Sequence, residues 1–232
     1  MKIDELSVFF PVYNEEKNIP VTVEKAIAVL KTLGLKKYEI ILVDDGSKDK
    51  SPEIIDNLAK KYNFIKAIHQ ANGGYGCALR TGLANASYDW IVYTDADGQF
   101  DFSEVTKFLE KAEEADVIYA YKIKRSDPPF RMFAAAGWAF SLFLVLGLRV
   151  KDVDTGFKMV NKKVLQKIAP LESTRGGMIN AELVMKARKA GFRFAQVSVN
   201  HYHRLYGKPS GVKLEVIIQS YLDLLKLWWK LH

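Results

Sequence analysis

An apolar stretch that ends in two acids decides the fold of this chain. It reads Ile91-Val92-Tyr93-Thr94-Asp95-Ala96-Asp97-Gly98-Gln99-Phe100. The apolar run predicts a buried strand, and ligands of an open α/β sheet bind where its strands end. Carboxylate and carboxamide oxygens suit Mg²⁺ or Mn²⁺, so this turn is a candidate metal site. An Asp-Gly turn that only ends a strand explains the same residues, so the rest of the chain must decide.

Apolar runs alternate with helical patterns through the first half of the chain. The runs that predict strands are Leu6–Phe10 (closed by Pro11), Glu39–Val43, Phe64–Ile68, Trp90–Thr94 and Asp116–Tyr121. Four patterns predict helices. The first begins at an Asn18 cap and ends at Gly34, and the others run from Ser51 to about Tyr62, from Cys77 to Ala86, and from a Ser103 cap to about Lys111. This alternation indicates an α/β fold with a mostly parallel sheet that helices cover on both faces.

The second half, from about residue 122, has a different character. A basic loop broken by prolines covers residues 122–131, and the run from Met132 to Leu148 carries no charge. That run is at the short limit for crossing a bilayer, so we expect a helix that is buried or lies in the membrane interface. The remaining predicted elements are a short strand after Lys158, helices near Val164 and from Ala181 to Ala190, a strand from Phe194 to Val199, and an amphipathic helix from Val212.

Composition limits the class of protein. The 232 residues fit one domain, and 49% hydrophobic with 26% charged residues is ordinary globular composition. A net charge of +7 favours an anionic partner such as a nucleotide, a lipid phosphate or a membrane surface. The single cysteine, Cys77, excludes an internal disulfide. The first residues lack the order of a signal peptide, so we expect a cytoplasmic protein.

Polar turns follow three of the predicted strands, and parallel strands would bring them to one edge of the sheet. The first turn carries Tyr13 and Glu15, the second Asp44 and Asp45, and the third the acid pair of residues 95–97. Carboxylates repel a nucleotide unless a divalent metal bridges them to its diphosphate. A carboxylate away from the metal can instead accept a hydrogen bond from a nucleobase N–H. The sequence therefore predicts a site for a nucleoside-diphosphate sugar.

Four motifs resemble those of the family-2 glycosyltransferases, and most closely the polyprenyl-phosphate (dolichol-phosphate mannosyltransferase-like) branch. They are Pro11-Val12-Tyr13-Asn14-Glu15, Val43-Asp44-Asp45-Gly46-Ser47, Asp95-Ala96-Asp97-Gly98-Gln99 and Arg204-Leu205-Tyr206-Gly207-Lys208. The resemblance covers essentially the whole chain. It implies one glycosyltransferase domain of GT-A fold, with a nucleotide-sugar-binding half in about residues 1–121, an acceptor- and membrane-facing half in about 122–232, and inverting, metal-dependent sugar transfer.

The resemblance also implies site residues. The nucleoside would be held by Pro11, Tyr13, Glu15, Val43 and Asp45, with Asp45 as the base reader and Asp44 as a turn acid. Mg²⁺ or Mn²⁺ would be held with the diphosphate by Asp95, Asp97 and Gln99, with Ala96 between them. Arg204 and Lys208 would close over the phosphates. Where relatives carry Gly-Ser-Arg, this chain has Ala120-Tyr121-Lys122, so Lys122 would take the phosphate contact, or Arg125 or Arg131 would replace it. The catalytic residues implied are Asp95, Asp97, Arg131 and Arg204.

The acceptor decides whether the reaction needs a base. A polyprenyl phosphate is already ionised, so the enzyme has to position it and offset charge repulsion. A glycan or small-molecule hydroxyl would need a general base, for which Asp152, Asp154 and Glu182 are candidates. Histidines 201 and 203 suit phosphate contacts better than zinc binding.

Several alternatives stay open. The sugar donor can be GDP- or UDP-linked, since uracil and guanine both present an N–H. A non-catalytic nucleotide or nucleic-acid binding module is a distant alternative, but the basic residues lack interleaved aromatics, so we expect no nucleic-acid partner. A nucleotidyltransferase would carry a glycine-rich basic loop after the first strand, where this chain has Tyr13-Asn14-Glu15-Glu16. We expect a peripheral enzyme at the inner face of the cell membrane.

Overall fold

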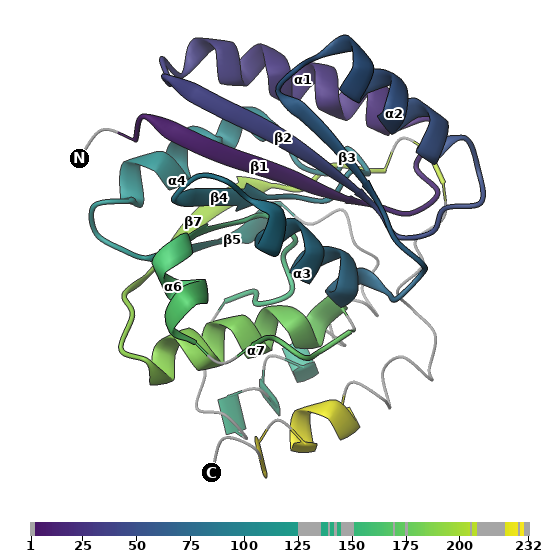
Figure 1. The fold of residues 1–232 in the computed structure, drawn as a ribbon. Coiled ribbons are helices and arrows are strands. Elements are labelled where there is room, and N and C mark those ends of the chain that lie inside the picture. The colour runs from purple at the N-terminus through teal and green to yellow at the C-terminus, as the bar shows by residue number, and fades with distance from the viewer. Residues whose placement is uncertain are drawn as a thin grey trace.

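A mixed sheet of seven strands forms the centre of the protein in the computed structural model (Figure 1). The structure describes residues 3–124, 136–138, 140–141, 143–144, 151–168, 170–174, 176–204, 206–207, 221–226 and 228–229. The strand order is β3-β2-β1-β4-β6-β5-β7. The strands are β1 (Glu5–Val12), β2 (Lys37–Asp44), β3 (Ile65–His69), β4 (Trp90–Tyr93), β5 (Val117–Lys124), β6 (Lys158–Asn161) and β7 (Phe194–Asn200).

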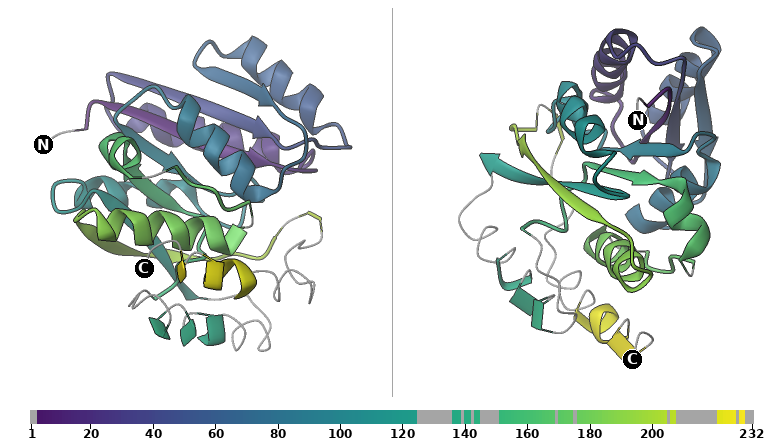
Figure 2. Two further views of the ribbon diagram at one scale, coloured as in Figure 1. Left: turned by 60° about the horizontal axis from the view of Figure 1, so that its bottom comes forward. Right: turned by 90° about the vertical axis from the view of Figure 1, so that its left-hand side faces the viewer.

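Helices cover both faces of this sheet (Figure 2). They are α1 (Ile19–Thr32), α2 (Ser51–Lys61), α3 (Tyr75–Asn85), the 3₁₀ helix η1 (Phe102–Glu104), α4 (Val105–Lys111), α6 (Lys162–Lys167) and α7 (Gly176–Lys189). One core cluster packs α1, α2 and α4 on one face, and a second packs α3, α6 and α7 on the other. Gly82 of α3 lies so close to β1 that an added Cβ would be 2.4 Å from the Phe9 ring. The predicted α/β class is therefore confirmed.

The sheet is mostly parallel, as predicted, but one strand reverses direction. β6 runs antiparallel to both β4 and β5 and lies between them. The pairs β1–β2, β1–β4, β2–β3 and β5–β7 are parallel. Because β6 follows β5 in the chain, the order of apolar runs alone could not place it between two earlier strands.

The predicted end of β1 and the predicted cap of α4 were both wrong. Pro11 does not close β1, which pairs with β2 as far as Val12. On its other side β1 pairs with β4, and this pairing stops at Phe9. The side of Pro11 that lacks an N–H therefore has no neighbouring strand, and no sheet hydrogen bond is lost. The expected cap at Ser103 is replaced by Asp101, whose carboxylate accepts the Ser103 N–H at 2.9 Å. This cap opens η1, which leads into α4.

The uncharged run from Met132 to Leu148 lies largely outside the described residues, as does the start of the helix expected from Val212. The parts that are described, within 136–144 and 221–229, are helical and pack against α7. Trp138 and Leu224 are buried in that contact, and the Trp138 ring meets Tyr221 edge-on at 5.3 Å. None of the helices that the structure describes is both long and apolar enough to cross a membrane.

Candidate functional site

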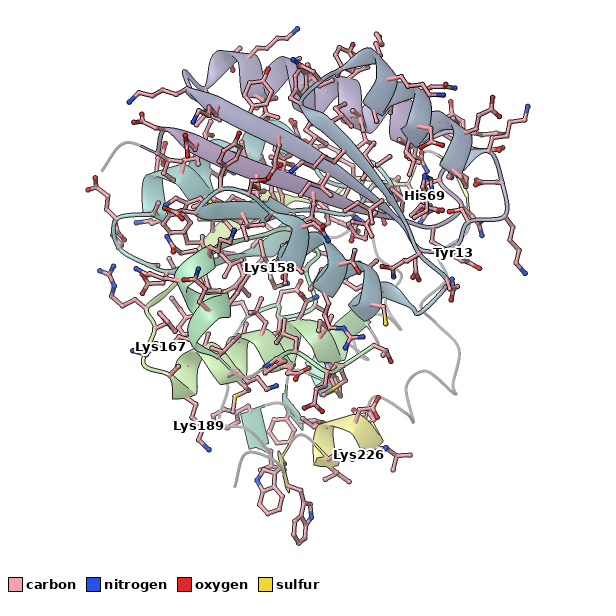
Figure 3. The ribbon with its side chains drawn as sticks, viewed as in Figure 1. Tyr13, His69, Lys158, Lys167, Lys189 and Lys226 are labelled. Carbon is pink, nitrogen blue, oxygen red and sulfur yellow. The ribbon has the colours of Figure 1, made fainter. Side chains whose placement is uncertain are left out.

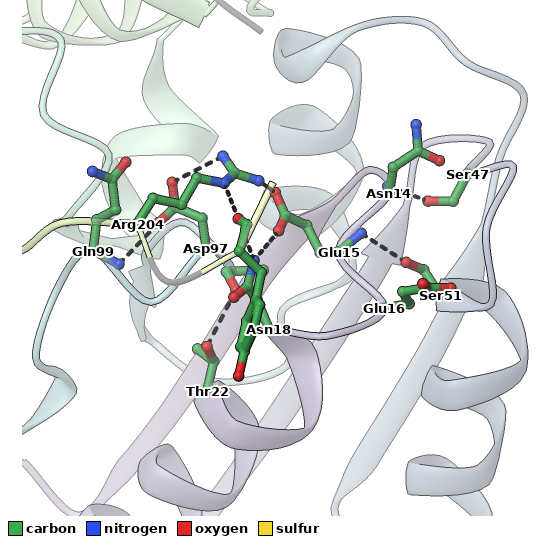
Figure 4. A network of polar contacts seen from close by, with 12 residues as sticks. Asn14, Glu15, Glu16, Asn18, Thr22, Ser47, Ser51, Asp97, Gln99 and Arg204 are labelled. Atoms are coloured by element: carbon green, nitrogen blue, oxygen red, sulfur yellow. Dashed lines mark hydrogen bonds and ion pairs between the residues drawn. The ribbon is translucent and has the colours of Figure 1, made fainter. Parts of the chain in front are cut away.

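The carboxyl ends of β1, β2 and β4 meet at one edge of the sheet, as the sequence predicts. Pro11 lies beside Val43 in register, and the last residue of β4, Tyr93, lies beside Phe9. The loop after β1 is pinned to the loop after β2, because Asn14 N donates to Ser47 Oγ at 2.9 Å and Glu15 N donates to Ser51 Oγ at 2.8 Å. The two loops therefore form one unit (Figure 4).

The predicted nucleoside residues differ in accessibility. Tyr13 directly follows β1 and is 43% exposed, so its ring can contact a ligand. Val43 is fully buried in the core cluster with Leu79. A ligand could therefore reach Val43 only through its backbone.

The neighbouring acids Asp44 and Asp45 have different partners. Asp44 accepts the Ser47 N–H at 3.0 Å and lies 3.2 Å from His69 Nδ1, which fits the turn role predicted for it. Asp45 Oδ1 accepts from Gln70 Nε2 at 2.7 Å and from Gly73 N at 2.9 Å, and Oδ2 accepts from Gly74 N at 2.8 Å. Asp45 thus ties the end of β2 to the glycine-rich turn before α3.

The acid pair after β4 lies in a partly desolvated position. Burial raises the pKa of Asp95 to about 6, the charge of Asp97 adds to the rise, and Tyr75 and the cations of Lys122 and Lys158 oppose it. Burial also raises the pKa of Asp97, against the Gln99 N–H and the charge of Arg204. Two carboxylates held this close, with raised pKa values, are an arrangement that a divalent cation would stabilise.

Arg204 bridges the first and third turns (Figure 4). Its Nη1 lies 3.4 Å from Asp97 Oδ2, its Nη2 is ion-paired with Glu15 Oε1, and its Nε donates to the Tyr206 carbonyl at 2.7 Å. Asn18 Nδ2 donates to Glu15 Oε2 at 2.6 Å, so the expected cap residue of α1 instead orients this carboxylate. Burial raises the pKa of Glu15 despite Asn18 and Arg204, which lower it.

Gln99 and Ala96 hold the turn in place. Gln99 N donates to Asp97 Oδ1 at 3.0 Å, and its Nε2 donates to the Tyr202 carbonyl at 3.1 Å. The Ala96 carbonyl accepts from Thr22 Oγ1 at 3.2 Å. The turn of residues 95–99 is therefore fixed to α1 on one side and to the loop after β7 on the other.

The basic residues of the prediction fall into two groups. Lys122 lies on β5, and its charge lowers the pKa of Asp95 and Asp97, so the structure brings it to the acid pair. Arg125, Arg131 and Lys208 lie outside the described residues.

The sequence reasoning missed two neighbours of Asp95. The Tyr75 hydroxyl and Asp95 Oδ1 are both buried, and neither has a hydrogen-bond partner of good geometry in the described part of the chain. Lys158 is fully buried, and its Nζ lies 5.9 Å from the centre of the Tyr93 ring (Figure 3). Burial lowers the pKa of Lys158 to about 8, against the charges of Asp154, Asp152 and Asp95. A lysine at the start of a strand gave no signal of burial in the sequence.

The donor set fits a divalent metal that a ligand completes. Asp95 and Asp97 offer hard oxygens, and Oδ1 of Asp95 is a buried acceptor without a partner of good geometry in the described chain. Within the described residues no group of three or more His, Cys, Asp or Glu side chains could hold a metal ion. Oxygens from the amide of Gln99 and from a bound diphosphate would supply the rest.

Comparisons with known proteins identify the family of this chain. The model of Glycosyl transferase family 2 matches residues 7–169. Dolichyl-phosphate beta-glucosyltransferase ALG5A of Trichomonas vaginalis is 29% identical over 237 residues, covering 96% of this chain and 72% of the relative. Undecaprenyl-phosphate 4-deoxy-4-formamido-L-arabinose transferase of Yersinia enterocolitica is 28% identical over 227 residues, covering 97% and 67%. Both names are of polyprenyl-phosphate sugar transferases, which confirms the resemblance seen in the four motifs.

Solved structures share the fold at lower identity. Glucosyl-3-phosphoglycerate synthase of Mycobacterium tuberculosis, in complex with Mn²⁺, uridine diphosphate and phosphoglyceric acid, matches with a TM-score of 0.73 and 20% identity. The match covers 97% of this chain and 78% of that one. This similarity confirms the predicted GT-A architecture.

Proposed function

The chain belongs to glycosyl transferase family 2, and from this premise we propose that it transfers a sugar from a nucleoside diphosphate to a polyprenyl phosphate. One observation carries the proposal: Arg204 pairs with Glu15 of the loop after β1 and with Asp97 of the turn after β4, where these parallel strands end. The acceptor class is supported by the dolichyl- and undecaprenyl-phosphate relatives.

The described residues divide the work of binding the sugar donor. Mg²⁺ or Mn²⁺, held by Asp95, Asp97 and Gln99, would neutralise the charge that develops on the leaving diphosphate. Arg204 leaves its ion pairs with Glu15 and Asp97 and turns its fork to the phosphates, where a guanidinium binds two oxygens at once. Lys122 adds a second positive charge beside the acid pair.

Transfer itself then needs little acid–base help. An oxygen of the acceptor phosphate attacks the anomeric carbon from the side opposite the diphosphate, and the nucleoside diphosphate leaves with the bonding electrons. The acceptor oxygen is already ionised, so no proton has to be removed. The enzyme contributes alignment and charge compensation. Arg131 and Lys208, outside the described residues, would face the same phosphates.

Asp45 is our candidate reader of the nucleobase. Its Oδ2 accepts the Gly74 N–H, and a carboxylate oxygen has room for a second hydrogen bond. The base N–H that Asp45 would read is present in both uracil and guanine, so we propose a UDP- or GDP-linked sugar. Mn²⁺ and uridine diphosphate in the solved relative support a metal-dependent site of this kind.

Apolar side chains on the two helical segments support work at a membrane surface. Phe140 is 62% exposed, Leu144 72%, Leu225 53% and Trp229 79%. Lys189 and Lys226 lie at the same lower end of the molecule in Figure 3. Exposed aromatics beside lysines suit the interface of an anionic bilayer. We propose peripheral binding at the inner face of the membrane, where a polyprenyl phosphate presents its head group.

A second candidate is transfer to a glycan or small-molecule hydroxyl, with Asp154 as general base. The surrounding protein desolvates the Asp154 carboxyl, Asp152 repels its charge, and its pKa rises to about 6 although the side chain is exposed. Glu182 does not suit this role, because its oxygens accept from Glu172 N and Ser173 N and pair with Lys186 at 2.6 Å. Product that stays in water on extraction with organic solvent would favour this candidate.

The test of metal-dependent transfer replaces one acid at a time. Asp97→Ala removes both the metal ligand and the Arg204 partner, so we expect transfer to fall by about 10²-fold or more while circular dichroism shows an intact fold. Asp101→Asn, four residues further on, keeps a cap oxygen for η1 and should transfer normally. Full activity of Asp97→Ala in the presence of a chelator would overturn the proposal.

A further inference from the structure

The turn that follows Asp152 lies directly on the first acid of the metal pair. A Cβ added at Gly156 would be 2.2 Å from Asp95 Oδ2 and 2.6 Å from its Cγ. No side chain can come that close, so the backbone of this turn forms one wall of the Asp95 carboxylate. Oδ1 of Asp95 has no hydrogen-bond partner of good geometry among the described residues, so packing, more than hydrogen bonding, holds the group.

The end of the turn, from Thr155 to Lys158, lies in the core. Lys158 Nζ donates to the Thr155 carbonyl, and the same ammonium lies over the ring of Tyr93. Lys158 and Tyr93 are both fully buried, and Tyr93 Oη donates to Asn180 Oδ1 at 3.0 Å. Tyr93 is the last residue of β4 and precedes Asp95 by two residues, so this end of the turn contacts the strand that carries Asp95.

The start of the turn, at Val153 and Asp154, contacts the helical segment at 136–144. Trp138 Nε1 donates to Asp154 Oδ1 at 3.1 Å. Trp138 is buried, and Val153 packs in the same apolar cluster as Trp138, Met178 and Leu224. The position of this end therefore depends on where Trp138 sits.

The opposite side of the same segment carries the exposed Phe140 and Leu144. A continuous series of contacts thus runs from an exposed apolar surface to the metal site, through Trp138, Asp154 and Gly156 to Asp95. Two residues within one segment, 138 and 140, face the interior and the surface respectively.

We propose that Trp138 is a positioning residue for Asp95, acting through Asp154 and the turn at Gly156. It orients the Asp154 carboxylate, which fixes the turn, and the turn fixes the metal ligand. The inference rests on the proposed function, since it assigns Asp95 to a metal. It couples the segment that would meet the lipid to the geometry of the sugar-donor site.

The experiment measures Mn²⁺ affinity by electron paramagnetic resonance, with Mn²⁺ alone and with UDP or GDP added, and no acceptor. Trp138→Phe keeps an aromatic ring in the cluster but removes the N–H donor. We expect its Mn²⁺ dissociation constant to rise by about tenfold, as when an outer partner of a metal ligand is lost. Tyr62→Phe, which removes a hydroxyl that donates to Glu24 Oε1 at 2.9 Å, is the control and should bind Mn²⁺ as the wild type does.

Three further variants separate positioning from loss of stability. Leu224→Ala weakens the same cluster and should lower the thermal midpoint without changing Mn²⁺ affinity. Asp154→Asn keeps an oxygen for Trp138 and should bind Mn²⁺ more tightly than Asp154→Leu. Combining Trp138→Phe with Asp154→Leu should cost no more than the larger single effect, because both remove one contact.

The outcomes decide between the inference and the function on which it rests. Unchanged Mn²⁺ affinity in a folded Trp138→Phe protein overturns the inference and leaves the function standing. If Trp138→Phe does not fold, Gly156→Ala replaces it: its Cβ displaces the Asp95 carboxylate, so wild-type Mn²⁺ affinity in that variant would overturn the inference. A wild-type protein that binds no Mn²⁺ with either nucleotide overturns both. A change in the pH profile of transfer with constant Mn²⁺ affinity would assign Asp154 to base catalysis and contradict positioning.

Discussion

Arg204 is the residue at which the two halves of the site meet. Its guanidinium pairs with Glu15, from the loop after β1, and with Asp97, from the turn after β4. We propose that the same guanidinium binds the phosphates of the sugar donor. Arg204 therefore pairs with Asp97, the carboxylate that would bind the metal, and would also contact the phosphates. Binding of the metal and binding of the phosphates therefore place opposite demands on one side chain.

This competition gives Arg204→Ala two effects of opposite sign. Removal of the guanidinium frees Asp97 Oδ2 and removes a positive charge beside the acid pair, so Mn²⁺ alone should bind more tightly. The sugar donor loses a phosphate contact, so kcat/KM should fall by about 10²-fold or more. Calorimetry and steady-state kinetics check the two effects, with Arg204→Lys expected between the wild type and Arg204→Ala. Weaker Mn²⁺ binding by Arg204→Ala would contradict this account of the site.

The raised pKa of Asp95 predicts how the site responds to pH. A metal binds the ionised carboxylate, and burial raises the pKa of Asp95 to about 6. Mn²⁺ affinity should therefore be constant above pH ~7 and fall by about tenfold per pH unit below 6. Without metal, the stability of the fold changes with pH in the opposite direction. The raised pKa of Asp95 contributes to the free energy of unfolding below the ordinary value of 3.8, and this contribution is lost as the pH rises through about 6.

Thermal unfolding with and without Mn²⁺, from pH 4 to 8, measures both effects in one series. The stabilisation by Mn²⁺ should grow as the pH rises. In Asp95→Asn it should be small and nearly independent of pH. A Mn²⁺ effect in the wild type that is the same at pH 5 and pH 7 would exclude Asp95 as a ligand.

At the scale of elements, hydrophobic patterns were enough to predict the strands and helices of the first half, and the acid-ended strands predicted their shared edge. The patterns could not show that β6 inserts between β4 and β5, because that order depends on packing between segments distant in the chain. They could not show that β1 continues through Pro11, because the reason lies in the shorter β4 beside it.

The site was predicted as far as its motifs reach. Asp95, Asp97, Glu15 and Arg204 were chosen from sequence, and the structure places them together. The turn at Gly156 and the buried Lys158 were not assigned to Asp95, because a contact across the sheet has no local pattern. Which atoms bind the sugar donor stays a prediction.

A pair of helix glycines tests the packing of α3 on the sheet. In Gly82→Ala the new Cβ would be 2.4 Å from the Phe9 ring, so we expect a loss of about 1–3 kcal/mol in the free energy of unfolding from overpacking. At Gly137, also helical, an added Cβ meets nothing within 4 Å, so Gly137→Ala should be stabilising by up to ~1 kcal/mol. Urea denaturation measures both. Equal effects would show that the contact with Phe9 is not what requires a glycine.

In the whole molecule, the sheet edge that carries the acid pair is joined to the apolar helical segments through α7 and the turn at Gly156. This arrangement suits an enzyme that takes one substrate from water and the other from a bilayer. The turn packs against Asp95 on one side and is tied to the segment at 136–144 on the other. Transfer and membrane contact would therefore be linked within one fold.

Cosedimentation with anionic phospholipid vesicles tests the proposed membrane surface. Trp229→Ala and Leu225→Ser remove exposed apolar area and should lower the bound fraction several-fold. Val21→Ser is the control, because Val21 is 44% exposed on α1, away from the two segments (Figure 1). Equal losses in all three variants, or none in the first two, would place the membrane contact elsewhere.

Partition of the labelled product between water and organic solvent tests whether the protein transfers a sugar to a polyprenyl phosphate. The protein is incubated with polyprenyl phosphate in detergent, Mn²⁺ and a panel of radiolabelled UDP- and GDP-sugars, and the mixture is extracted with organic solvent. We predict label in the organic phase for at least one sugar donor, none with Asp97→Ala, and none when the metal is chelated. Label that stays in the aqueous phase with every sugar donor, or that enters the organic phase equally with Asp97→Ala, would contradict the account.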